Sequence, residues 1–77
     1  MKELDVVVLT EDLPDHGLKE GDLGTVVLVH GDADAYEVEF VTLDGETITV
    51  ATLTASQIRS VAAREIAHAR KVAGWIA

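Results

Sequence analysis

The sequence predicts a mainly β fold, in which five short strands form a small, strongly bent barrel and an amphipathic helix follows. Three observations support this prediction. Short runs rich in β-branched residues recur along residues 1–61, and glycine, aspartate and proline separate them. From Ala62 onward the chain is rich in alanine, and its apolar residues take helical spacing. We therefore expect a barrel at residues 1–61 and a helical extension at residues 62–77. Since the chain has only 77 residues, one small core is the most that it can build.

The first two strands are expected on either side of a long loop. The run DVVVL at residues 5–9 is β-branched and ends at a polar Thr-Glu-Asp sequence. A loop follows over residues 10–24, and the run TVVLVH at residues 25–30 predicts the second strand. The turn sequence GDAD ends that strand.

The third and fourth strands are expected to form a hairpin. In AYEVEFVT, residues 35–42, apolar and polar residues alternate, which is typical of a strand with one buried face. The Asp-Gly pair at residues 44–45 is a strong hairpin signal before TITVATL, residues 47–53, where Ile48 and Val50 share a phase. A tight turn then leads to a short fifth strand at residues 58–61. Five short strands with two hairpins favour a barrel of the SH3-like kind.

The C-terminal residues predict an amphipathic helix. One stripe has spacings of 4, 3, 4 and 3 residues, and it consists of Ala62, Ile66, Ala69, Ala73 and Ile76. Gly74 near the end is typical of a helix C-cap, which would leave Trp75 and Ile76 beyond it. Such a stripe can cover an open end of the barrel or bind a second protein or a second copy of the chain, and the two roles are compatible.

The glycines of the long loop raise the question of a ligand site. Gly21 and Gly24 lie three residues apart before a strand, whereas a phosphate-binding loop places its glycines before a helix N-terminus. We therefore expect both glycines to occupy turn positions with positive φ.

The sequence predicts neither an enzyme nor a cofactor or metal site. His30, Asp32 and Asp34 form an H-x-D-x-D sequence, but a calcium loop would also need a distal bidentate glutamate. A turn rich in aspartate and glycine between two strands explains this sequence fully. The two serines lie outside any G-x-S-x-G context, and the chain has no cysteine.

Charge is distributed unevenly along the chain. Residues 1–57 carry thirteen acids against two lysines, a net charge of −11, whereas residues 58–77 carry four cations against Glu65, a net charge of +3. Because nucleic-acid affinity depends on clustered lysine and arginine, the acidic part argues against nucleic-acid binding and favours a basic protein partner. The apolar run of four residues near the start is too short for a secretory signal or a membrane span, so we expect a cytoplasmic protein.

Several linked motifs follow one another between about Leu4 and Val61: D-x-V-x-L, L-P-x-x-G-L-x-x-G-D-x-G-T-V-V, Y-E-V-E-F, D-G-x-T and S-Q-I-R. Together they resemble one uncharacterised bacterial family, domain of unknown function 4926. The resemblance implies an SH3-like barrel with no established activity, in a family whose members look like small accessory or antitoxin-like proteins. The GDLGTVV sequence is also similar to a turn of KOW-type barrels, although those barrels surround it with lysine and arginine.

These observations predict a non-enzymatic binding module whose acidic surface meets a basic protein partner, with a toxin as one candidate. The alternative is a structural subunit that associates with itself through the C-terminal helix. A third hypothesis, weak nucleic-acid contact, would depend on Arg59, Arg64, Arg70 and Lys71. The candidate partner-binding residues are the loop acids and three residues of the helix: Glu11, Asp12, Asp15, Glu20, Asp22, Ile66, Trp75 and Ile76.

Overall fold

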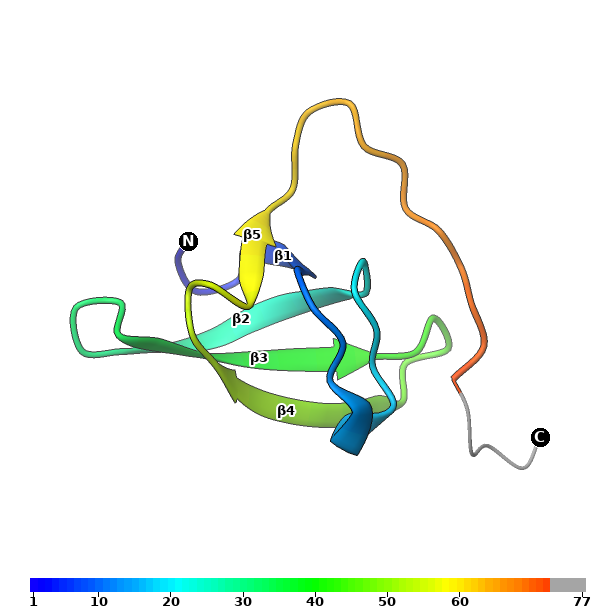
Figure 1. Ribbon diagram of the computed structural model, residues 1–77, viewed down its shortest axis with the longest axis horizontal. Helices are drawn as coiled ribbons and strands as arrows, with labels where there is room; N and C mark the ends of the chain where they lie inside the picture. Colours follow the sequence, from blue (N-terminus) through cyan, green and yellow to red (C-terminus); the bar gives the residue numbers. More distant parts are fainter. Residues whose placement is uncertain (73–77) are drawn as a thin grey trace.

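The fold is a single antiparallel β-sheet of five strands, as seen in a computed structural model that describes residues 1–72 (Figure 1). The strands and one short 3-10 helix follow one another in the order β1 (Val6–Leu9), η1 (Pro14–His16), β2 (Leu23–His30), β3 (Ala35–Val41), β4 (Thr47–Leu53) and β5 (Ile58–Ser60). All five predicted strands are present, and the strand borders differ from the predicted ones by no more than two residues.

The sheet has the strand order β4-β3-β2-β1-β5. In Figure 1, β1 and β5 run steeply across the direction of β2, β3 and β4, so the sheet is strongly bent. Register shifts between Val26 and Leu28 and between Phe40 and Val41 interrupt its ladders, and such bulges increase local bending. The core is a cluster of ten buried side chains: Val7, Leu9, Leu18, Val26, Tyr36, Val38, Phe40, Ala51, Leu53 and Ile58.

The alternation of buried and less buried residues in β3 was predicted correctly, whereas the choice of which β4 residues face the core was not. Every second residue of β3 from Tyr36 to Phe40 is buried, and the glutamates between them are only partly buried. In β4, however, Val50 is exposed and Ala51 and Leu53 are buried. The bulge beside the start of β4 shifts its register against β3, so the expected phase of residues 48 and 50 does not hold.

The prediction of a closed barrel was wrong. Strands β4 and β5 form the two ends of the sheet, and within residues 1–72 no ladder joins them. Strand β5 has only three residues, and β1 pairs with it through all three. The bent sheet therefore encloses its core without closing on itself.

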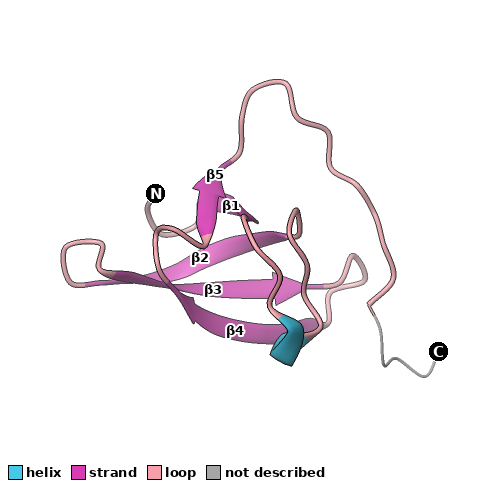
Figure 2. Ribbon diagram, in the orientation of Figure 1, coloured by secondary structure: helices cyan, strands magenta, loops and turns pink. Residues whose placement is uncertain are grey.

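The predicted C-terminal helix is also absent from the described residues. Residues 61–72 contain only a turn at positions 63–64 and otherwise neither helix nor strand (Figure 2). A helix this short is marginal in water without a surface to bury its apolar stripe, and Ile66 is 93% exposed. Residues 73–77, including Trp75 and Ile76, lie outside the described part of the chain. No helix formed by residues 1–72 has the length and apolar character required to cross a lipid bilayer.

The two loop glycines have different structural roles. Gly21 has φ +94°, as predicted for a turn. Gly24 does not have positive φ, and it lies inside β2. A Cβ on Gly24 would lie 2.5 Å from Val38 Cγ1 and 2.8 Å from Phe40 Cε1. Gly24 is therefore required because β3 side chains pack against the backbone of β2.

Candidate protein-binding site

The long connection between β1 and β2 forms a structured acidic loop, which we define as residues 10–22. Leu13 and Leu18 form an isolated antiparallel bridge around η1, and Gly17 ends η1 with φ +69°. The loop is tied to β1, because the Gly21 amide donates to Leu9 O at 2.9 Å and the Leu9 amide donates to Asp22 O at 2.9 Å. These backbone bonds hold the loop in one shape.

Two acids of this loop help to build it. The Glu20 amide donates to Asp12 Oδ1 and the Lys19 amide donates to Asp22 Oδ2, each at 2.8 Å. Aspartate side chains stabilise turns in this way. Asp12 and Asp22 therefore have fixed positions before any partner is considered.

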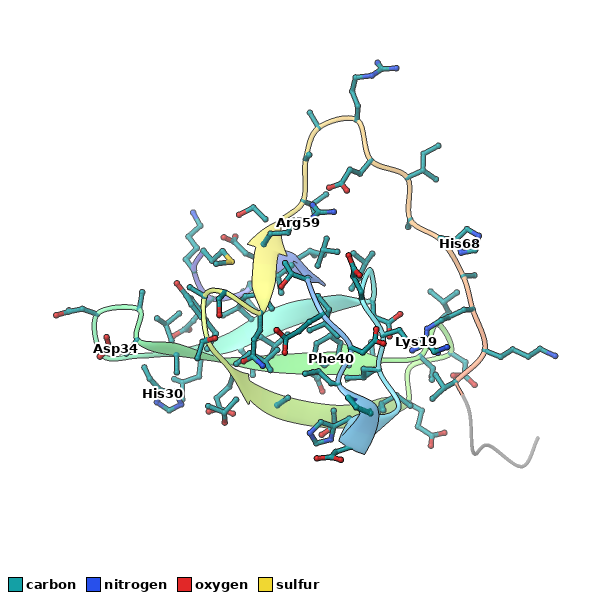
Figure 3. All side chains as sticks on the ribbon, viewed as in Figure 1. Lys19, His30, Asp34, Phe40, Arg59 and His68 are labelled. Carbon is teal, nitrogen blue, oxygen red and sulfur yellow. The ribbon has the colours of Figure 1, made fainter. Side chains whose placement is uncertain are left out.

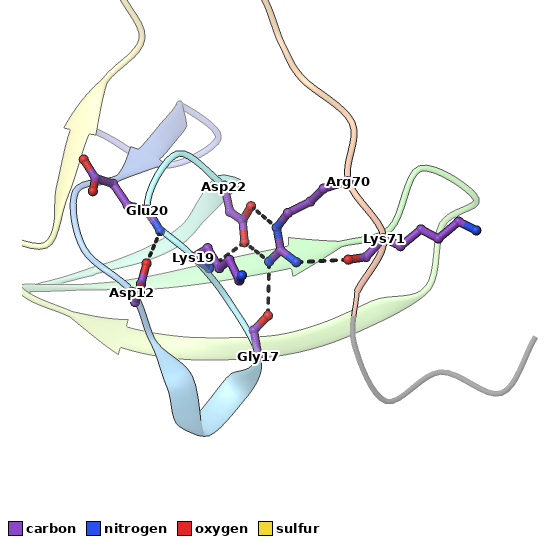
Figure 4. A network of polar contacts seen from close by, with 7 residues as sticks. All are labelled: Asp12, Gly17, Lys19, Glu20, Asp22, Arg70 and Lys71. Carbon is purple, nitrogen blue, oxygen red and sulfur yellow. Dashed lines mark hydrogen bonds and ion pairs between the residues drawn. The ribbon is translucent and has the colours of Figure 1, made fainter.

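Asp22 binds an arginine from the far end of the chain. Arg70 Nε donates to Asp22 Oδ1 at 2.8 Å, and Arg70 Nη2 forms an ion pair with Asp22 Oδ2 (Figure 4). Arg70 Nη2 also donates to Gly17 O at 3.1 Å. A planar guanidinium matches a carboxylate in this two-pronged geometry, which a lysine cannot reproduce.

The Asp22–Arg70 pair is partly shielded from water. The Asp22 side chain is 18% exposed and that of Arg70 is 27% exposed. Burial is the largest influence on the pKa of Asp22 and would raise it, but the hydrogen bonds from Arg70 and from the Lys19 amide outweigh burial and lower this pKa. The pKa of Arg70 is raised by its hydrogen bond to Asp22, and the charge of Asp12 adds to this effect.

The remaining predicted site residues are not gathered at this pair. Glu11 Oε2 accepts a hydrogen bond from Gln57 Nε2 at 3.2 Å, which ties it to the turn before β5. Asp15 and Glu20 have exposed side chains on the loop surface. Ile66 is exposed on the segment that leads to Arg70.

Arg70 is the residue at this loop that sequence reasoning did not place there. It was considered only as a nucleic-acid contact, although the opposite charges of the acidic part and the C-terminal part could have suggested pairing between them. Because Asp22 and Arg70 are 48 positions apart, no local sequence pattern connects them. A second cation, Arg59, pairs with Glu65 at 2.6 Å.

A second polar cluster lies on the outer face of the sheet, away from the acidic loop. His30 Nε2 lies 2.6 Å from Glu37 Oε2, and Thr52 Oγ1 donates to the same carboxylate. Figure 3 shows His30 and Asp34 at the opposite end of the molecule from Lys19 and His68. Within residues 1–72, no group of three or more histidine and acidic side chains is arranged to hold a metal ion.

The fold and the loop define this chain as a small antiparallel β domain with an acidic, arginine-binding loop. The model of the family described as "Domain of unknown function (DUF4926)" matches residues 3–60, and the chain therefore belongs to this family. The match ends at the last residue of β5, so it includes Asp22 but not Arg70. No curated protein and no solved structure matches the chain.

Proposed function

We propose that this protein is a non-enzymatic binding module whose acidic loop captures an arginine of a basic protein partner. The observation that supports the proposal is the contact of Arg70 with Asp22 and with Gly17 O. The loop holds its carboxylate and its carbonyl in place through its own backbone bonds, so it presents a formed acceptor site.

The segment of residues 61–72 acts as an internal occupant of this site. It arches away from β5 and returns to the molecule beside the acidic loop and the β3–β4 hairpin (Figure 1). It forms no backbone ladder with the sheet. Since side chains rather than a ladder hold it, a partner segment with the same arginine chemistry competes for the same acceptors.

Charge favours a basic partner over nucleic acid. The net charge of −11 over residues 1–57 attracts cationic protein surfaces and repels phosphate. Two of the four C-terminal cations, Arg59 and Arg70, are already paired with acids. An antitoxin-like role, with a basic toxin as the partner, is one form of this proposal.

The proposal is tested with a labelled peptide of residues 62–72 and the full chain carrying Arg70→Ala, which vacates the site. We expect the peptide to bind this variant at low salt and to bind the wild-type chain at least about tenfold more weakly, because the tethered segment competes at high effective concentration. Fluorescence anisotropy measures both affinities.

Matched changes give the controls. Arg70→Ala in the peptide should abolish binding, whereas Arg64→Ala in the peptide should leave most of it. Adding Asp22→Asn to the Arg70→Ala chain should also abolish binding. Equal affinity for the wild-type and Arg70→Ala chains, or binding that survives Asp22→Asn, would refute the proposal.

A second candidate function is self-association by exchange of residues 61–72 between two copies. The helix that was expected to drive self-association is absent from the described residues, but the Asp22–Arg70 contact could equally form between two chains because its segment has no ladder to its own sheet. Sedimentation velocity tests this candidate: Asp22→Asn should convert an exchanged dimer into a monomer, and a wild-type chain that stays monomeric at all concentrations excludes it.

A further inference from the structure

An open groove lies next to the Asp22–Arg70 pair, between residues 67–72 and the sheet. Its volume is about 850 Å³. The acidic loop and the strands β2 to β4 with their connections contribute six apolar side chains to its wall: Leu18, Leu23, Phe40, Val41, Leu43 and Ile48. We call this space the hairpin groove, because the β3–β4 hairpin supplies four of these six side chains.

The hairpin groove exposes apolar surface beside negative charge. Leu43 at the hairpin turn is 96% exposed, and Val41 and Leu23 are also exposed. Asp22, Asp44 and Glu46 line the same groove, and Arg70 and Lys71 of the segment line it as well. An apolar patch bordered by charge is typical of a surface that binds another protein, and these carboxylates favour a cationic occupant.

Residues 70–72 show how a segment approaches this groove. Arg70 reaches Asp22, Lys71 is exposed and points away in Figure 4, and Val72 lines the groove and is partly buried. Arg70 and Val72 therefore face the sheet together.

We propose that the hairpin groove binds a bulky apolar side chain of the partner, placed two residues after the arginine that binds Asp22. The partner segment then has the pattern arginine, any residue, and an apolar residue larger than valine. This inference rests on the proposed function and names the partner chemistry that the same site selects. Such a segment displaces residues 70–72, because it makes the same ion pair and buries more apolar surface.

The test uses amidated peptides of residues 62–72 and the full chain with Arg70→Ala. Val72→Phe in the peptide should strengthen binding by about fourfold or more, since burial of one methylene group corresponds to roughly that factor. Val72→Ser should weaken binding. Adding Leu43→Ser to the chain should remove the advantage of the phenylalanine peptide, whereas Leu28→Ser, an exposed leucine outside the groove, should preserve it.

The outcomes separate this inference from the proposed function. If the peptide binds through Asp22 but all three versions bind equally, or if Leu43→Ser leaves their ranking unchanged, the groove inference is wrong and the arginine site stands. If no peptide shows Asp22-dependent binding, the proposed function itself fails. A third outcome also contradicts the inference. If the phenylalanine peptide binds more tightly than the valine peptide only when the chain also carries Trp75→Ala, the groove binds the chain's own C-terminal residues rather than a partner.

Discussion

The sheet and the C-terminal segment of residues 61–72 are positioned by different interactions. In the sheet, backbone ladders and ten buried apolar side chains determine where each strand lies. In the segment, the side-chain pairs Arg59–Glu65 and Asp22–Arg70 determine its path. Apolar burial involves no charge that salt can screen or that a proton can neutralise, whereas charge pairs respond to both salt and pH. The sheet is therefore held by apolar burial and backbone ladders, whereas the segment is held by charge pairs that salt and acid weaken.

The largest expected effect tests the sheet against the segment directly. Phe40→Ala removes a ring that is 2% exposed, and it should lower the free energy of unfolding by about 3–5 kcal/mol. Ile66→Ala, on the exposed segment, should change it by less than about 0.5 kcal/mol. Urea denaturation followed by circular dichroism gives both values. If both variants lowered the free energy of unfolding by similar amounts, Ile66 would be packed in the core, contrary to this account.

A smaller effect is expected within the sheet at its closest backbone approach. Gly24→Ala should lower the free energy of unfolding by about 1–3 kcal/mol, because the new methyl group would overlap Val38 and Phe40. A Cβ at Gly21 would meet open space, so Gly21→Ala should lower the free energy of unfolding by only about 1 kcal/mol, because the residue has positive φ. Thermal unfolding ranks the two variants, and a greater loss at Gly21 would mean that packing at Gly24 is looser than described.

Sequence reasoning found the strands because their signals are local. The alternation from Tyr36 to Phe40 and the Asp-Gly turn at residues 44–45 each involve neighbouring residues. Barrel closure was not predictable in the same way, since it depends on whether β4 and β5 meet. The role of Gly24 was missed because it depends on β3 side chains that are distant in sequence.

The helix prediction failed because periodicity reports a possible apolar face and not a surface that will bury it. At the start of the expected helix, Glu65 accepts a hydrogen bond from the Ala62 amide, as in the first turn of a helix, but the helix does not continue. Glu65 instead pairs with Arg59 and Arg70 pairs with Asp22, so charge pairs hold the segment in a non-helical path. The acidic loop was chosen as a candidate site because of its charge, and its pairing with Arg70 has no local signal.

The smallest expected effect is a shift in the pKa of the Asp22 carboxyl. The pKa of this carboxyl is lowered in the folded chain, so its contribution to stability is present above the ordinary aspartate pKa of about 3.9 and is lost as the pH falls through its lower folded value. Arg70→Ala should move the pKa of Asp22 upward. Arg64→Ala, which changes an exposed arginine of the same segment, should leave it unchanged.

The most direct test of the central claim, that the acidic loop is an arginine site occupied by Arg70, is an NMR titration of the Asp22 carboxyl carbon. The account predicts a pKa below that of an ordinary aspartate in the wild-type chain, a higher value in the Arg70→Ala chain, and the wild-type value in the Arg64→Ala chain. An Asp22 pKa that is the same in the wild-type and Arg70→Ala chains would show that Arg70 does not occupy the loop, and would contradict the account.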